Sequence, residues 1–201
     1  MPFLQPATAN YFGFIPVTGN GVEAQINAYP VSSSEGAIAA GDLCVMTSRN
    51  TVKTASSASG SATAIMVIGV AAQAFAANAG STTITNTNKC LIYDSPGQLF
   101  AISDSSSGAV GSSGIGLSYF VSGTGVTGST GVNATLQRSV MAISGAVQAS
   151  SGGQVMIVGL HPVENNVYAT GATGTANVRK WIVSLRTHMF QPAASVDLLT
   201  T

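Results

Sequence analysis

The chain has 201 residues, 7% of them charged, and its seven Lys and Arg residues balance its seven Asp and Glu residues. Soluble domains typically contain about 25% charged residues, so this composition favours a chain that works inside an assembly, with a stable secreted domain as the alternative. The basic residues are too few to neutralise many phosphates, and no stretch approaches about eighteen apolar residues, so neither a nucleic-acid partner nor a membrane partner is predicted.

The first 20 residues differ from the rest in their proline and aromatic content. The prolines are Pro2, Pro6 and Pro16, and the aromatic residues are Phe3, Tyr11, Phe12 and Phe14. Because proline lacks the N–H that a strand donates, we expect an extended arm over residues 1–20 and one β-rich domain over residues 21–201. We predict that the four aromatics dock on a partner subunit. The alternative is a strap packed over the domain's own core. The segment has no basic region followed by an apolar region, so no secretory signal is expected.

Short apolar clusters of strand length follow, each bounded by Gly, Ser, Asn or Asp. They are Leu43–Met46, Ile65–Val70, Leu91–Tyr93, Leu99–Ile102, Leu117–Val121, Val140–Ile143, Val155–Leu160 and Trp181–Leu185. This pattern predicts an all-β fold, either a β-sandwich or a small β-barrel. Long Gly/Ser-rich loops are expected at Ser57–Gly60, Ser105–Gly114 and Gly123–Gly131, and Ala40–Asp42 is predicted to be a turn. Residues Ala71–Ala79 are predicted to be either a short helical turn or a strand exit.

The stretch CLIYDSPGQLFAI, Cys90–Ile102, contains a carboxylate beside a Ser-Pro-Gly corner. Pro96 fixes φ and Gly97 accepts positive φ, so the stretch predicts a strand, a tight turn and a second strand. An aspartate at the start of a turn can accept a hydrogen bond from the backbone N–H two residues on. We therefore predict that Asp94 is a turn carboxylate rather than a catalytic one.

Two short motifs in the glycine-rich middle have weak support. GTGVTG, Gly123–Gly128, matches the spacing of a dinucleotide-binding loop, but Ser129-Thr130-Gly131 is a poor helix start and no acidic residue follows at the ribose-binding distance. We interpret it as a loop and expect no cofactor. Asn133–Thr135 matches a glycosylation sequon, which has no meaning without secretion.

The remaining reactive residues do not form a recognisable catalytic or metal-binding pattern. Cys44 and Cys90 lie in separate apolar runs, so they are expected to be buried thiols in a protein made in a reducing cytoplasm. A hydrolase triad would have to use His161, which Glu164 follows closely, or His188. A structural role is favoured for both histidines. No metal site is expected, because such a site needs three or four clustered ligands. We therefore expect a protein that is not an enzyme.

Several motifs together resemble the capsid decoration, or cement, proteins of tailed bacteriophages. They are AGDLCV at Ala40–Val45, IGVA at Ile68–Ala71, YDSPGQLF at Tyr93–Phe100, the Gly/Ser/Thr-rich segment Gly111–Thr135, HPVENN at His161–Asn166 and WIVSLRTHMF at Trp181–Phe190. The resemblance extends from about residue 36 to residue 190 and leaves out the arm. It implies a β-rich protein on the outside of the virion capsid that bridges major capsid protein subunits and associates with copies of itself.

The composition agrees with this implied role. No charged residue lies between Lys53 and Lys89 or between Asp104 and Arg138, and long charge-free tracts suit a core or a protein interface. The expectation is therefore a structural virion protein, made in the host bacterial cytoplasm, that stabilises the mature head. The alternative is another virion or surface structural protein, such as a fibre, an adhesin module or a capsid subunit.

Overall fold

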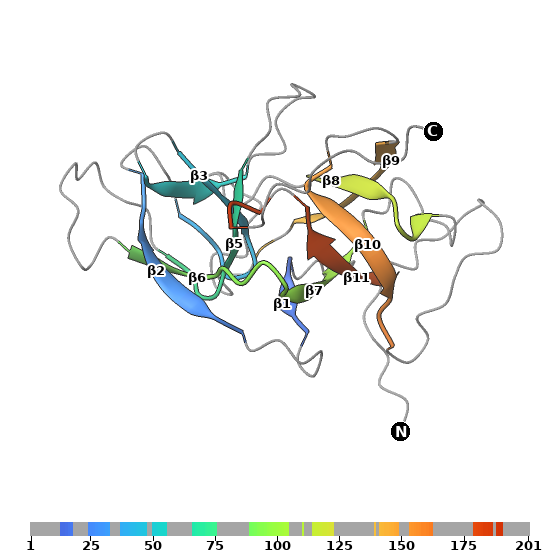
Figure 1. The fold of residues 1–201 in the computed structure, drawn as a ribbon, viewed down its shortest axis with the longest axis horizontal. Helices are drawn as coiled ribbons and strands as arrows, with labels where there is room; N and C mark the ends of the chain where they lie inside the picture. Colours follow the sequence, from blue (N-terminus) through green and yellow to red (C-terminus); the bar gives the residue numbers. More distant parts are fainter. Residues whose placement is uncertain are drawn as a thin grey trace, which may run out of the picture.

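The structure, a computed structural model, describes residues 13–17, 24–32, 37–47, 50–55, 66–75, 89–104, 110, 114–122, 139, 141–148, 153–162, 179–186 and 188–190. These residues form two antiparallel sheets and contain no α-helix. Figure 1 shows the five-stranded sheet on the left and the six-stranded sheet on the right. The predicted all-β class is confirmed, and the arrangement is sandwich-like with open sheets.

The five-stranded sheet contains the strands from the first half of the chain. Its spatial order is β2 (Ile26–Pro30), β6 (Lys89–Tyr93), β5 (Val67–Ala71), β3 (Leu43–Met46) and β4 (Val52–Thr54). Beyond β2, Val31 forms a parallel bridge with Val52, and the Ser32 N–H donates to the Val52 carbonyl at 2.9 Å. The end of β2 therefore curls toward the opposite edge of its own sheet.

The six-stranded sheet combines one strand near the N-terminus with the second half of the chain. Its spatial order is β1 (Ile15–Pro16), β7 (Leu99–Ser103), β11 (Lys180–Leu185), β10 (Val155–Leu160), β8 (Ser118–Ser122) and β9 (Ala142–Gln148). The chain passes from β6 to β7 through the predicted corner, where the Gln98 N–H donates to the Ser95 carbonyl at 3.1 Å. This corner therefore connects the two sheets and is not a hairpin within one of them.

Side-chain alternation along the strands produces two apolar cores. Leu43 and Val45 of β3 lie in the larger core, which also contains Trp181 and other buried residues of the six-stranded sheet. Cys44, between them, points to the smaller core on the opposite face of the five-stranded sheet. Both faces of β3 are therefore buried, which explains why the sequence there is a continuous apolar run rather than an alternating one.

The predicted turn Ala40–Asp42 is confirmed. Gly41 has a φ of 87°, a conformation that glycine adopts at little cost. The Asp42 N–H donates to the Ala39 carbonyl at 3.1 Å, and the Asp42 carboxylate accepts the Ala39 N–H at 2.8 Å. The turn therefore delivers the chain directly into β3.

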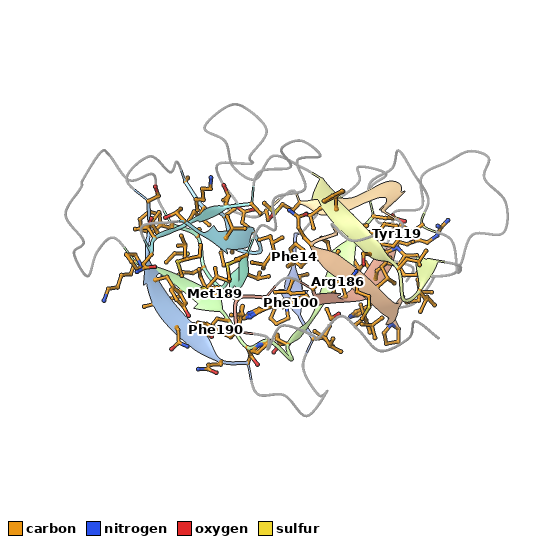
Figure 2. All side chains as sticks on the ribbon, turned by 45° about the horizontal axis from the view of Figure 1, so that its top comes forward. Phe14, Phe100, Tyr119, Arg186, Met189 and Phe190 are labelled. Carbon is orange, nitrogen blue, oxygen red and sulfur yellow. The ribbon has the colours of Figure 1, made fainter. Side chains whose placement is uncertain are left out.

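The described part of the N-terminal segment follows the strap alternative. β1 pairs with β7, and Phe14 is buried against Phe100, with ring centroids 5.9 Å apart and nearly perpendicular planes. Figure 2 shows the two rings side by side near the middle of the molecule. Phe14 is thus a core residue and offers no docking surface, which corrects its predicted role. Phe3, Tyr11 and Phe12 lie outside the described residues.

Each of the eight predicted apolar clusters overlaps a strand. Ala71 ends β5, and Phe75 pairs with Ile38 in an isolated bridge, which favours the strand exit over the helical turn. The predicted Gly/Ser-rich loops lie outside the described residues, apart from Val110 and Gly114. The GTGVTG motif and the sequon also lie outside them.

Candidate functional site

The Asp94 carboxylate lies in a buried polar cluster that joins the corner after β6 to β2. Its Oδ2 accepts a hydrogen bond from the Asn27 side chain at 2.8 Å and another from the Tyr29 hydroxyl. The prediction of a local backbone donor was wrong, because the residue two positions on is Pro96, which has no N–H. Asp94 therefore connects two segments that are far apart in the sequence.

His188 lies at the same end of the five-stranded sheet. It forms a parallel bridge with Val67 of β5, and the Met189 N–H donates to the Val67 carbonyl at 2.8 Å. The Phe190 N–H donates to Nδ1 of His188 at 3.1 Å, so the neutral ring carries its proton on Nε2. Figure 2 shows Met189 and Phe190 over the five-stranded sheet. The segment after β11 thus returns from the six-stranded sheet to the other one.

The protonation states in this cluster favour a structural role over acid–base chemistry. Burial lowers the pKa of His188, while the Asp94 carboxylate acts in the opposite direction. Burial and the hydrogen bond to Asp94 raise the pKa of Tyr29, so its hydroxyl stays a donor. Burial, together with the Asp42 carboxylate, raises the pKa of the Cys90 thiol to about 12. A nucleophile needs a lowered pKa or a base that activates it. The pKa values of Tyr29 and Cys90 are both raised, and the Asp94 carboxylate beside Tyr29 contributes to that increase.

The stability of the protein should depend on the protonation of His188. Because its pKa is lower in the folded state than in the unfolded chain, the unfolded state binds more protons near pH 6. The contribution of the neutral imidazole is therefore fully present above about pH 6.5 and is lost as the pH falls toward the folded-state pKa.

As the pH falls from about 7 to about 5, we expect the free energy of unfolding of the wild type to decrease more than that of His188→Asn. Asparagine keeps an acceptor near the Nδ1 position for the Phe190 N–H but does not titrate. Urea unfolding of both proteins across this range measures the difference. Parallel curves would contradict the assignment of His188 as a buried neutral side chain.

A second buried polar network lies beside the larger core. Oδ1 of Asp104 accepts the Arg179 N–H at 2.9 Å, and Oδ2 accepts the indole N–H of Trp181 at 3.4 Å. The Arg179 guanidinium donates to the Val110 carbonyl at 2.9 Å and lies 4.0 Å from Oδ2 of Asp104. Burial raises the pKa of Asp104, and these donors partly offset the increase. Arg179 is therefore a buried structural cation, not part of a basic surface.

The histidine-based triad receives no support from the described contacts. His161 directly follows β10, and its backbone N–H donates to the Lys180 carbonyl at 3.0 Å. His188 belongs to the other sheet, and its Nδ1 already accepts a backbone N–H. Glu164, which follows His161 in the sequence, lies outside the described residues.

An exposed apolar surface lies where the segment before β8 meets β10. Ile115, Leu117 and Val158 have 42%, 38% and 44% of their surface exposed. Hydrogen bonds hold them near one another, because the Gly116 N–H donates to the Ile157 carbonyl and the Ile157 N–H donates to the Leu117 carbonyl. We call Ile115, Leu117 and Val158 the β8–β10 apolar surface. Exposed apolar clusters of this kind suit protein contacts.

The sequence does not predict the contacts of Asp94 with Asn27 and Tyr29, nor the position of His188 beside them. Asn27 and Tyr29 lie 67 and 65 positions before Asp94, and His188 comes from the far end of the chain. The sequence only weakly indicates the β8–β10 apolar surface. Ile115-Gly116-Leu117 precedes an apolar strand and lies in a tract without charged residues. Its exposure depends on the pairing with β10, which the sequence does not reveal.

No group of three His, Cys, Asp or Glu residues that could hold a metal ion occurs within the described residues. The same part of the chain includes no helix long and apolar enough to span a bilayer. Comparison with protein-family models, with curated proteins and with solved structures finds no match for this chain.

Proposed function

We propose that this chain is a structural virion protein that binds the outer surface of a tailed-phage head. In this role it would be made in the host bacterial cytoplasm and would stabilise the mature capsid by bridging subunits of the major capsid protein. The proposal rests on the motif resemblance from about residue 36 to residue 190 and on the surface of the described domain.

The observation that supports the proposal best is the distribution of charge. Asp42, Asp94 and Asp104 are all buried, so the described surface presents no carboxylate, and the four other acidic residues lie outside the described residues. The same surface exposes large apolar side chains, including the β8–β10 apolar surface. A surface poor in carboxylates and rich in exposed apolar groups suits a chain that is covered by other proteins.

Stabilisation of the head would follow from mass action. A protein that binds the assembled lattice and not its dissociated subunits shifts the equilibrium toward the lattice by its binding free energy. Copies that each bridge several subunits add avidity, because the second contact of a bound copy is intramolecular. The proposed contacts are Phe3, Tyr11 and Phe12 of the arm together with the β8–β10 apolar surface.

Heat disruption of phage heads tests the stabilising role. The heads are assembled from the major capsid protein encoded nearest to this chain and are expanded before the protein is added. We expect the added protein to raise the temperature at which the heads lose their shell structure. An unchanged temperature at saturating protein would contradict the proposal, and filaments or shells of the protein alone in negative stain would favour the alternative structural role.

The arm can be tested separately from the domain. Removing residues 1–12 leaves Phe14 and β1 in place, so the domain should stay folded. We expect the truncated protein to bind expanded heads at least about tenfold more weakly, because aromatic anchors carry much of an interface's free energy. The triple substitution Phe3→Ala, Tyr11→Ala, Phe12→Ala should reproduce most of the loss. Undiminished binding by both variants would remove the arm from the proposal.

A further inference from the structure

The six-stranded sheet turns one face toward the larger core and presents an apolar face on the opposite side. Along β11, alternate residues from Trp181 to Leu185 are buried in the larger core, so Ile182 points the other way. The strand register extends this side across the sheet, because Ile182 pairs with Ala101 of β7 and Ala101 pairs with Ile15 of β1. Ile15 is 44% exposed. The row therefore reaches solvent at its β1 end.

Neighbouring positions of β7 and β10 complete this apolar side. Leu99 and Met156 both pair with Ser184, which alternation along β11 places beside Ile182. Val158 is the extra residue where the register of β10 shifts, and it is exposed and part of the β8–β10 apolar surface. We call this side of the sheet the outer face, and its apolar residues are Ile15, Leu99, Ala101, Met156, Val158 and Ile182.

The charged side chains described on the outer face are both cationic. Lys180 begins β11 and alternates with the buried Trp181, so it shares the side of Ile182. Arg186 follows β11, and its guanidinium donates to the hydroxyl of Ser118. Figure 2 shows Arg186 at the six-stranded sheet. The three carboxylates within the described residues are buried, so none of them lies on this face.

We infer that the outer face binds a protein surface that has an apolar centre and a carboxylate beside it. The apolar side chains of the outer face pack on that centre, and the Arg186 guanidinium donates to the carboxylate. A guanidinium can hold a carboxylate through two parallel hydrogen bonds, which fixes the orientation of the contact. The inference rests on the proposed function, in which this surface belongs to the major capsid protein of the expanded head.

The charge of the outer face distinguishes this partner from other occupants. A second copy of the same face would bring cations against cations, and no described carboxylate could pair with them. Nucleic acids and anionic membranes are bound by clusters of basic residues, whereas Lys180 and Arg186 are the only basic residues described on this face. A centre without charge and a polar rim are typical of the interfaces between proteins.

Val158→Asp tests the apolar part of the contact. Val158 is 44% exposed, so the substitution should leave the fold intact, but binding would bury the new carboxylate without a partner. We expect binding to expanded heads at least about tenfold weaker than that of the wild type in quantitative co-sedimentation. The matched control is Met66→Asp, which adds the same charge at a 51% exposed position just before β5 of the other sheet. It should bind as the wild type does.

Arg186→Glu tests the charged part of the contact. We expect binding at least about tenfold weaker, because two carboxylates would then face each other, and nearly normal binding for Arg186→Lys, which keeps the charge. Lys53→Glu makes the same charge reversal on an exposed residue of β4 and should leave binding unchanged. Added NaCl should weaken binding of the wild type more than that of Arg186→Gln, because salt screens an ion pair that only the wild type forms.

The outcomes separate this inference from the proposed function. A wild type that does not bind expanded heads would contradict the proposed function and the inference with it. A wild type that binds, with Val158→Asp and Arg186→Glu binding equally well, would overturn the inference alone. A dimer of the free protein that Val158→Asp dissociates would assign the face to a second copy. Binding of the wild type to phosphatidylglycerol vesicles that Arg186→Glu abolishes would assign it to a membrane. Either result would overturn the inference.

Discussion

Gly69→Ala is expected to lower the free energy of unfolding by about 3 kcal/mol or more. Gly69 has a φ of 153°, a conformation that residues with a side chain rarely adopt. A Cβ at this position would overlap the backbone carbonyl oxygen of Tyr93 and lie 2.8 Å from the Ile92 side chain. A backbone carbonyl cannot move aside as a flexible side chain can, so β5 and β6 must separate.

The irregularity around Gly69 determines which residues of β5 reach each core. The register of β3 against β5 shifts between Cys44 and Val45, and as a result both Val67 and Val70 lie in the larger core. Ile68 points to the smaller core. A substitution that forces this site back to regular geometry would therefore disturb both cores.

Gly159→Ala is the matched control for Gly69→Ala. Gly159 also lies at a register shift, in β10, but a Cβ there meets no atom within 4 Å. We expect this variant to stay within about 1 kcal/mol of the wild type. Chemical unfolding followed by circular dichroism measures both changes. Equal effects of the two substitutions would contradict the close approach of β5 and β6.

Trp181→Ala is expected to cost about 4 kcal/mol, the typical loss when a large buried aromatic is truncated. Trp181 is fully buried in β11, which lies between β7 and β10 in the six-stranded sheet. The truncation leaves a cavity in the larger core and removes the indole N–H donor to Asp104, which is 3% exposed.

Trp181→Phe separates the two contributions to that loss. Phenylalanine keeps much of the apolar volume but cannot donate to Asp104, so we expect a smaller loss of about 2 kcal/mol. Both losses are measured as shifts of the denaturant midpoint. The slope of the free energy of unfolding against denaturant concentration should stay unchanged. A loss below about 1 kcal/mol for Trp181→Ala would contradict the placement of this side chain in the core.

The strands that could be predicted from the sequence are those with a continuous apolar run. Leu43–Met46 and Val155–Leu160 were predicted with the bounds that β3 and β10 have. β2 was missed, because its sequence INAYP has only one large aliphatic residue and ends in proline, and β4 was missed because it has only three residues. Edge strands bury less surface than central ones, so their sequences carry a weaker apolar pattern.

The arm prediction shows why tertiary contacts could not be foreseen. Proline at position 16 argued against a strand, yet Pro16 pairs with Phe100 at the outer edge of the sheet, where a missing N–H is tolerated. Asp94 shows the same limit. The corner could be predicted from Ser95-Pro96-Gly97, but the partners of the carboxylate on β2 depend on strand pairing, which brings distant segments together.

Co-sedimentation with phage heads tests the proposed function most directly. The purified chain is mixed with expanded heads that lack it and, in parallel, with unexpanded shells of the same major capsid protein. We predict that it pellets with the expanded heads at a saturable and constant ratio and stays in the supernatant with the unexpanded shells. A chain that remains in the supernatant with both, while still folded by circular dichroism, would contradict the proposal.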